Sequence, residues 1–316
     1  QQIYFVLCLC NTYILSCASS AGASTRQHHR STMSTTTSND LLTQAKKNKA
    51  TTVVDGYTYF NLTPPLDLDK TYPLFEERGF NLIVQTMHDG IDSKSANIDK
   101  SQYMAIHQVM YAFTQSNAED MYHKVKQTME TYVSEQVLPA LQSVTGVRLL
   151  HAFRARWHNH VFMSCWMSRF FSSMDKPLQS MFSNKAYVCT ASMTLRTFFS
   201  HGYTRLSSGF LNHPVVNALL EEITKFRNTQ EADMTLIADT VGIIQHLGAI
   251  STTNHIKLVV ADNKEFKSGT WKSAPALLKY TDLSIYRNDF ETLLIRRTGD
   301  YYRKKSLVWI SMDTVR

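Results

Sequence analysis

Residues 101–114 read SQYMAIHQVMYAFT and carry the clearest helical pattern of the chain. Asp99 precedes them with Gln102 three residues later, a spacing typical of a helix start. Five residues at spacings i, i+4, i+7, i+8 and i+11 share one face of this helix: Tyr103, His107, Met110, Tyr111 and Thr114. An adjoining apolar stripe consists of Ile106, Val109 and Phe113. Two stripes predict two neighbours, which either both belong to the same bundle or include a partner protein.

Helical spacing continues after this stretch. Ser116 and Glu119 form a second start signal before an amphipathic run that ends at Pro139. The next run places large residues at steps of three and four, and we expect them in the core: Leu150, Phe153, Trp157, Val161 and Cys165. Further helices are expected at 182–199, with an interruption near 200–202, at 215–226 after a start at Asn212 and Pro214, at 233–247 and at 285–310. The last has no stop signal before Arg316, so we expect a chain that is cut off there.

Composition agrees with an all-α fold. The 316 residues include 11 Gly and 7 Pro, about half of average usage, which disfavours turn-rich β architectures. Apolar residues at 43% and charged residues at 19% exclude wholesale disorder, because such a chain can bury enough apolar surface to offset its ordering entropy. The length predicts about two domains.

Charge and cysteine content limit the function classes. The net charge of +7 suits nucleic acid, an acidic partner or mere solubility, and the lack of a long basic run favours the last two. Three of the five cysteines fall within the first 17 residues, which leaves Cys165 and Cys189 for the body. This is neither a disulfide framework nor a structural zinc pattern. We expect reduced thiols in a cytoplasmic and nuclear protein that uses no metal or cofactor.

The N-terminal segment has two parts. Residues 1–32 begin with an apolar run of signal-peptide length, followed by small residues. A real signal would mean secretion, whereas the missing initial Met and the lack of a basic residue before the run favour upstream sequence outside the mature fold, with Met33 as the start. The run is too short to span a bilayer. Residues 33–74 are rich in Thr, Ser, Lys and Asn and predict a disordered polar tail.

The sequence contains no convincing catalytic pattern. His158, Asn159 and His160 spell the motif letters of a nuclease, yet that site needs separated histidines on a metal-binding finger, so a helix surface is the better interpretation. Glycine-rich phosphate loops, nucleophile elbows and paired metal-binding helix motifs are absent from the sequence. We therefore expect no enzyme activity.

Four ordered blocks resemble the N-terminal half of cullins, most closely the branch that forms SCF (F-box) ubiquitin ligases. The blocks are SQYMAIHQVMY at 101–111, MYHKVKQTMETYVSEQVLPAL at 121–141, RWHNHVFMSCWMSRFFSSMDK at 156–176 and YRNDFETLLIRRTGDYYRKKSLVWI at 286–310. The resemblance implies an elongated stalk of five-helix cullin repeats, an α-α superhelix. It places a first, adaptor-binding repeat at 75–180 and an incomplete second repeat at 181–316, and it implies that the C-terminal cullin-homology domain is absent.

The resemblance also implies where a partner binds. In cullins the adaptor docks on the second and fifth helices of the first repeat, which correspond here to residues 99–114 and 163–176. Tyr103 and Met104 match the family's adaptor-contacting aromatic and methionine, and Tyr111 matches a third contact position. Three positions depart from the pattern, since His107 and Ser173 stand where a tyrosine is usual and Lys176 replaces an arginine. Losing two aromatic anchors costs about 2 kcal/mol each unless the adaptor compensates.

By this resemblance the chain is a non-catalytic scaffold, the N-terminal fragment of a cullin-RING ubiquitin ligase for ubiquitin-dependent protein degradation. It would bind a BTB-fold adaptor that carries F-box proteins, while a RING protein and a ubiquitin-like modifier would act only through the missing C-terminal half. We expect no nucleic acid and no membrane partner. The alternatives are a generic α-helical repeat scaffold with a different partner, a basic nucleic-acid-binding module and, if residues 1–32 are real, a secreted helical protein.

Overall fold

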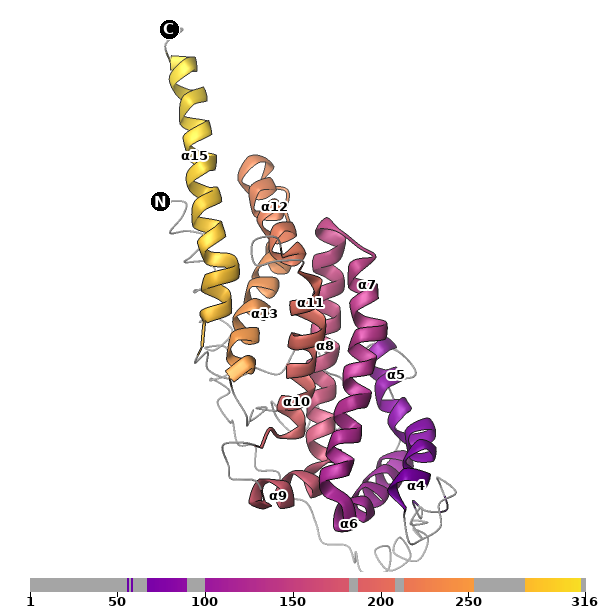
Figure 1. Ribbon diagram of the computed structural model, residues 1–316. Helices are drawn as coiled ribbons and strands as arrows, with labels where there is room; N and C mark the ends of the chain where they lie inside the picture. The colour runs from indigo at the N-terminus through magenta and orange to yellow at the C-terminus, as the bar shows by residue number, and fades with distance from the viewer. Residues whose placement is uncertain are drawn as a thin grey trace, which may run out of the picture. The chain divides into compact units, whose positions relative to one another are not determined.

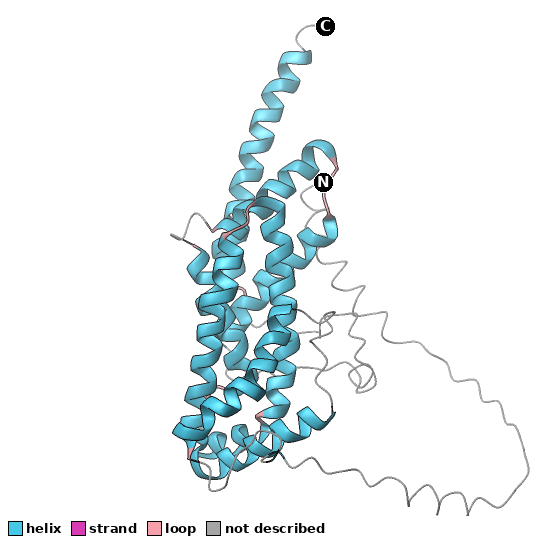
Figure 2. Ribbon diagram, turned by 90° about the vertical axis from the view of Figure 1, so that its right-hand side faces the viewer, coloured by secondary structure: helices cyan, strands magenta, loops and turns pink. Residues whose placement is uncertain are grey.

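The computed structural model describes Gly56, Thr58 and residues 67–89, 100–181, 187–207, 213–252 and 282–313. All of them belong to the second of two compact units, Val54–Arg316. Every regular element in these ranges is a helix, which confirms the predicted all-α class (Figure 1, Figure 2). The predicted leader at 1–32 lies outside the described residues.

The described helices fall into two groups along the chain. The first group is α4 (Leu68–Phe75), η1 (Glu76–Phe80), α5 (Asn81–Asp89), α6 (Lys100–Tyr132), η3 (Val133–Val137), α7 (Leu138–Gln142), α8 (Gly146–Phe170) and α9 (Ser172–Met181). The second group is α10 (Thr190–Thr197), η4 (Phe198–Tyr203), α11 (Thr204–Leu206), α12 (Pro214–Thr229), α13 (Met234–Thr252), η5 (Tyr286–Glu291) and α15 (Thr292–Asp313). The η segments are π-helical turns that continue directly into an α-helix. The predicted interruption of the helix near 200–202 is therefore wrong, because the chain continues helically through η4 into α11.

α6 consists of two helices that meet at a kink. Asn117 has non-helical backbone angles (φ −145°, ψ 49°) between two regular stretches. The helix start predicted at Ser116 and Glu119 is therefore confirmed, because a second helix begins at this kink. The kink divides α6 into a first half that begins at Lys100 and a second half that ends at Tyr132.

α8 is the central helix of the core. It contacts α5, α10, α12 and α13, and it lies beside α10 in Figure 1. The five core positions predicted from its spacing are confirmed as buried: Leu150, Phe153, Trp157, Val161 and Cys165. From His160 to Cys165 every residue is buried, so this part of α8 is covered on all sides.

Polar side chains join α12 to α15. α12 begins at Pro214, and proline is common at the first helical position because no backbone N–H needs a partner there. The capping residue is His213, which has extended backbone angles, and not Asn212, where the start was predicted. Arg297 Nη2 donates to Asn217 Oδ1 at 2.7 Å, and Arg227 Nη2 donates to Thr298 Oγ1 at 2.7 Å. These bonds fix the start of α15 against α12.

The predicted disordered tail at 33–74 is wrong at its end, because α4 begins at Leu68. Asp67 caps this helix, since its Oδ1 accepts from the backbone N–H groups of Asp69 and Lys70. Phe75 is fully buried and packs edge-on against Phe113 of α6, with ring centroids 5.9 Å apart. The polar composition of residues 33–74 gave no sign that a helix with core side chains begins there. Most of the remaining tail lies outside the described residues.

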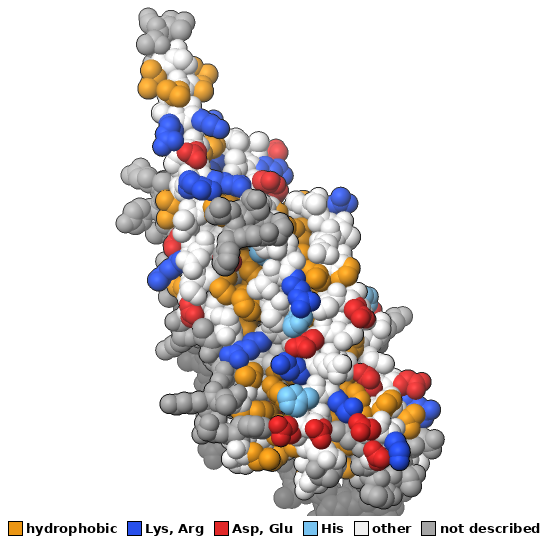
Figure 3. Space-filling model, viewed as in Figure 1, with side chains coloured by type: hydrophobic (Ala, Val, Ile, Leu, Met, Phe, Trp, Pro, Cys, Tyr) orange, Lys and Arg blue, Asp and Glu red, His pale blue; other side chains and the backbone are white. Residues whose placement is uncertain are grey.

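Two helices carry unusual apolar surface. Within the described chain, α13 alone is long and apolar enough to cross a membrane, and 56% of its window Met234–Ser251 is buried inside the structure, as expected for a core helix. The last turns of α15 expose apolar side chains: Leu307, Val308, Trp309, Ile310 and Met312. Figure 3 shows Lys and Arg side chains on α15 just before this apolar end.

Candidate functional site

The first half of α6 presents large apolar side chains to solvent. Met104 is 46% exposed and Tyr111 is 53% exposed. They are seven residues apart, so two helical turns place them on one side of α6, with the half-exposed His107 between them. We call Tyr103, Met104, His107 and Tyr111 the α6 face. Large apolar side chains are seldom this exposed without a reason when they cluster, which makes the α6 face the leading candidate for a binding surface.

The predicted split of α6 into two stripes is only partly correct. The stripe of Ile106, Val109 and Phe113 is fully buried, as expected for a core stripe. Met110 and Thr114, which the spacing places on the same side as Tyr111, are buried as well. Other parts of the protein therefore cover the first stripe and part of the second stripe. The outer edge of the second stripe remains exposed.

Tyr103 is held in place by aromatic neighbours. Its ring lies 5.1 Å from the ring of Phe170 and 6.0 Å from that of Trp166, both on α8. It also stacks on His107, with centroids 6.2 Å apart and planes 25° from parallel. Tyr103 is half-buried by these contacts. It therefore supports the α6 face from beneath more than it projects from it.

The other two predicted contact residues lie on α9. Lys176 has an exposed side chain, whereas Ser173 is half-buried and its hydroxyl oxygen has no hydrogen-bond partner among the described residues. Pro177 stands inside α9, so no N–H is available there for the carbonyl of Ser173, four residues earlier. α9 packs against α6 and against the end of α8. The structure thus puts Tyr103 and His107 in contact, and it places Ser173 and Lys176 on an adjacent helix.

The position of α9 depends on residues that the sequence did not reveal. Asp175 Oδ1 accepts hydrogen bonds from the Tyr187 hydroxyl at 2.5 Å, from the Thr190 N–H at 3.1 Å and from Thr190 Oγ1 at 2.6 Å. The Tyr122 hydroxyl of α6 donates to the carbonyl of Val188 at 2.9 Å. No periodic signal marks these pairs, because Asp175 and Thr190 are 15 residues apart across a connection.

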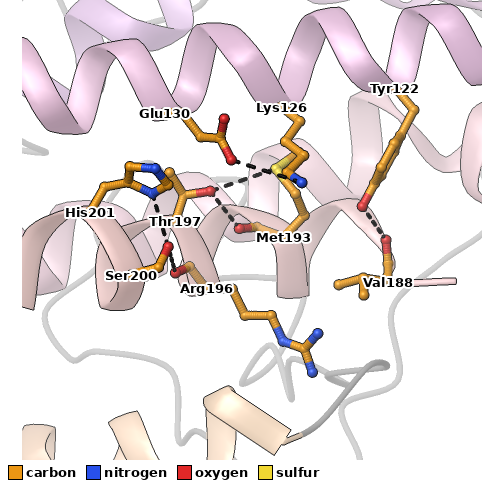
Figure 4. A network of polar contacts seen from close by, with 9 residues as sticks. All are labelled: Tyr122, Lys126, Glu130, Val188, Met193, Arg196, Thr197, Ser200 and His201. Atoms are coloured by element: carbon orange, nitrogen blue, oxygen red, sulfur yellow. Dashed lines mark hydrogen bonds and ion pairs between the residues drawn. The ribbon is translucent and has the colours of Figure 1, made fainter. Parts of the chain in front are cut away.

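A polar network lies beside the hydrogen bond from Tyr122 to Val188 (Figure 4). It borders a cavity of about 320 Å³ between the second half of α6, α10 and η4. Lys126 Nζ lies 3.9 Å from Glu130 Oε1, and Arg196 Nε donates to the carbonyl of Ile250 at 3.1 Å. Both basic groups therefore already have protein partners: Lys126 within α6 itself, and Arg196 between α10 and α13.

The histidines of α8 do not form a catalytic site. His160 is fully buried, and burial lowers its pKa to about 4, so it is neutral at pH 7. The pKa of His158 is also lowered by burial. Within the described part of the chain, no three His, Cys, Asp or Glu side chains gather as a metal site would require. The expected helix surface fits the half-buried His158 and Asn159, but it is wrong for His160, which lies inside the core.

Comparison with known families identifies the architecture. The family model described as the cullin alpha solenoid domain matches residues 83–316, nearly three quarters of the chain. The chain belongs to the cullin family. All six residues predicted to contact an adaptor lie within the matched region.

Curated relatives are cullins and cullin-like proteins of plants. Putative cullin-like protein 1 of Arabidopsis thaliana is 22% identical over 71% of this chain and 26% of its own length. Cullin-1 of Oryza sativa subsp. japonica is 24% identical over 62% of this chain and 22% of its own length. Cullin-like protein 3 of Arabidopsis thaliana is 22% identical over 75% of this chain and 77% of its own length. The chain therefore spans about a quarter of the length of the first and second of these cullins.

Proposed function

We propose that this cullin is a non-catalytic scaffold subunit of an SCF-type ubiquitin ligase and binds a BTB-fold adaptor that carries F-box substrate receptors. The observation that carries the proposal is the pair of exposed apolar residues, Met104 and Tyr111, on the α6 face of a cullin-family domain. The proposal includes ubiquitin-dependent degradation in the cytoplasm and nucleus as its setting.

The chemistry of such a scaffold is positioning. A scaffold that holds a substrate receptor near a charged conjugating enzyme raises their effective concentration without supplying a catalytic side chain. Helices that are packed along most of their length suit this task, because they hold the bound adaptor in a fixed place. A RING protein and a ubiquitin-like modifier are assigned to no residue of this chain.

The α6 face suits an apolar partner surface. Exposed Met104 and Tyr111 are side chains of the kind that fill pockets at protein interfaces, where aromatic residues and methionine are enriched. Tyr103, fixed by Phe170 and Trp166, keeps the helix surface rigid beneath them. The exposed side chain of Lys176 provides a polar group on the adjacent α9, whereas the hydroxyl oxygen of Ser173 is buried. A hydrophobic centre with polar groups at its rim is the usual anatomy of such an interface.

The test is a binding measurement with the full chain and the BTB-fold adaptor of the same organism. Met104→Ala combined with Tyr111→Ala should weaken the affinity by about tenfold or more, because truncated anchors are typical hot spots. Ile295→Ala is the matched control, since Ile295 is 67% exposed on α15 and lies outside the α6 face. Equal affinity of the double variant and the wild type, or no binding by the wild type, would refute the proposal.

A further inference from the structure

The carboxylate of Asp175 links α9 to the start of α10, in addition to the backbone segment between the two helices. Asp175 lies in the middle of α9, and its Oδ1 accepts three hydrogen bonds from the other side of that connection, one from Tyr187 and two from Thr190. Thr190 is the first residue of α10, so the carboxylate satisfies one of the free N–H groups at a helix start. Its negative charge also suits the positive end of the α10 dipole.

A second connection joins the same segment to α6. The Tyr122 hydroxyl donates to the Val188 carbonyl, and the rings of Tyr122 and Tyr187 lie 5.6 Å apart. Burial raises the pKa of Tyr122 to about 12, and burial together with Asp175 raises that of Tyr187, so both phenols keep the protons that they donate. Asp175 is therefore part of a chain of contacts from α9 through residues 187–190 to the second half of α6.

α9 needs such support to keep its orientation. It has ten residues, too few for a stable isolated helix, and Pro177 removes one internal hydrogen bond. Its apolar contribution to the core consists of Met174 and Leu178. The hydrogen bonds to Asp175 add a directional constraint to this apolar packing, since they fix α9 relative to the start of α10.

We infer that Asp175 is a positioning residue: it holds α9 at the angle that presents Lys176 beside the α6 face. The inference rests on the proposed function, because it concerns the same docking surface. Asp175 need not touch the adaptor itself. Its effect on binding arises through the orientation of α9.

Two substitutions separate this role from mere stability. Asp175→Ala removes all three hydrogen bonds, whereas Asp175→Asn keeps a carbonyl oxygen that accepts them. We expect Asp175→Ala to weaken adaptor affinity by about tenfold and Asp175→Asn to retain it within about threefold. Amide hydrogen exchange in α9 should rise in Asp175→Ala and stay near the wild-type value in Asp175→Asn.

The matched control is Asp289→Ala. Tyr203 donates to Asp289 Oδ2 at 3.3 Å, so this is also a tyrosine–carboxylate bond between distant segments, but it joins η4 to η5 and does not involve α9. This control should leave adaptor affinity and exchange in α9 unchanged. A lower melting temperature of Asp175→Ala with unchanged affinity and unchanged exchange in α9 would overturn the inference, as would equal losses in Asp175→Ala and Asp175→Asn.

Failure of the proposed function gives a different pattern. If the wild-type chain does not bind the adaptor, the docking role is refuted. The exchange experiment still shows whether Asp175 orients α9, since that measurement needs no partner.

Discussion

His160 stacks on Tyr132 between α8 and α6, with ring centroids 5.8 Å apart and planes 23° from parallel. Phe198 covers another side of the imidazole at 4.8 Å. His160 Nδ1 lies 3.2 Å from the carbonyl of Arg156, to which it donates, while Nε2 has no hydrogen-bond partner among the described residues. Burial removes a charged imidazole from water in this aromatic surrounding, and this desolvation is the main reason for its low pKa.

This arrangement predicts acid sensitivity. Burial lowers the folded-state pKa of His160 to about 4, below its value of about 6.5 in an unfolded chain. The unfolded state therefore takes up the proton first as pH falls. The stabilising contribution is complete above about pH 6.5 and is lost between pH 6.5 and 4, by up to about 3 kcal/mol. Urea unfolding across this range measures it.

The control is His160→Gln, which cannot titrate. Its unfolding free energy should depend less steeply on pH than that of the wild type, by at most about 1.4 kcal/mol per pH unit. His213, whose pKa is also lowered to about 4 by burial, should still contribute to the slope in both proteins. Identical slopes would mean that His160 is not the group responsible.

A cavity in the central helix should be costly. Phe153 is fully buried on α8 and contacts the rings of Phe198 and Tyr203 at 5.8 and 6.0 Å. We expect Phe153→Ala to lower the free energy of unfolding by about 3 to 5 kcal/mol. Met104→Ala should change it by less than about 0.5 kcal/mol, because Met104 is exposed. Chemical denaturation compares the two, and a similar cost for both would contradict the assigned core.

Two glycines of α13 should respond with opposite signs. A Cβ at Gly248 would lie 2.6 Å from the backbone oxygen of Asp282, too close for any side chain. Gly248→Ala should therefore destabilise the fold by about 1 to 3 kcal/mol. At Gly242 a Cβ would meet no atom within 4 Å, so Gly242→Ala should stabilise the helix by up to about 1 kcal/mol. Melting temperatures that shift in the same direction would show that α13 does not approach Asp282 this closely.

Replacing His107 with tyrosine should strengthen adaptor binding. His107 already stacks on Tyr103, and a phenol at this position has room to stack in the same way and extend further outward. We expect His107→Tyr to raise the affinity several-fold, since aromatic anchors are typical hot spots. Calorimetric titration of wild type and variant measures this. An unchanged or weaker affinity would indicate that the adaptor is adapted to the histidine.

Sequence patterns predicted the core of α8 well and the borders of helices less well. The steps from Leu150 to Cys165 leave one possible buried face, so spacing alone was sufficient. α4 was missed because Tyr72 and Phe75 stand within a polar stretch. The signal at Ser116 and Glu119 correctly marked the change from one helix to the next at Asn117, since such a pattern is typical of a helix start.

The candidate site divides in the same way. Spacing placed Tyr111 on the outer stripe of α6 and the resemblance added Met104, but the burial of Met110 depends on which neighbour covers the helix, and that is decided by tertiary packing. The hydrogen bonds from Thr190 to Asp175 could not be predicted, because the proximity of these two residues depends on how α9 and α10 are placed in the fold.

The kink at Asn117 has a consequence for how this surface can evolve. The second half of α6 is constrained by buried residues such as Met121, Val125 and Met129, whereas the first half exposes Met104 and Tyr111. Substitutions on the exposed side before the kink can change the surface that this part of the chain offers without disturbing the packing after it. Surface chemistry and core packing are thus assigned to separate stretches of one continuous segment.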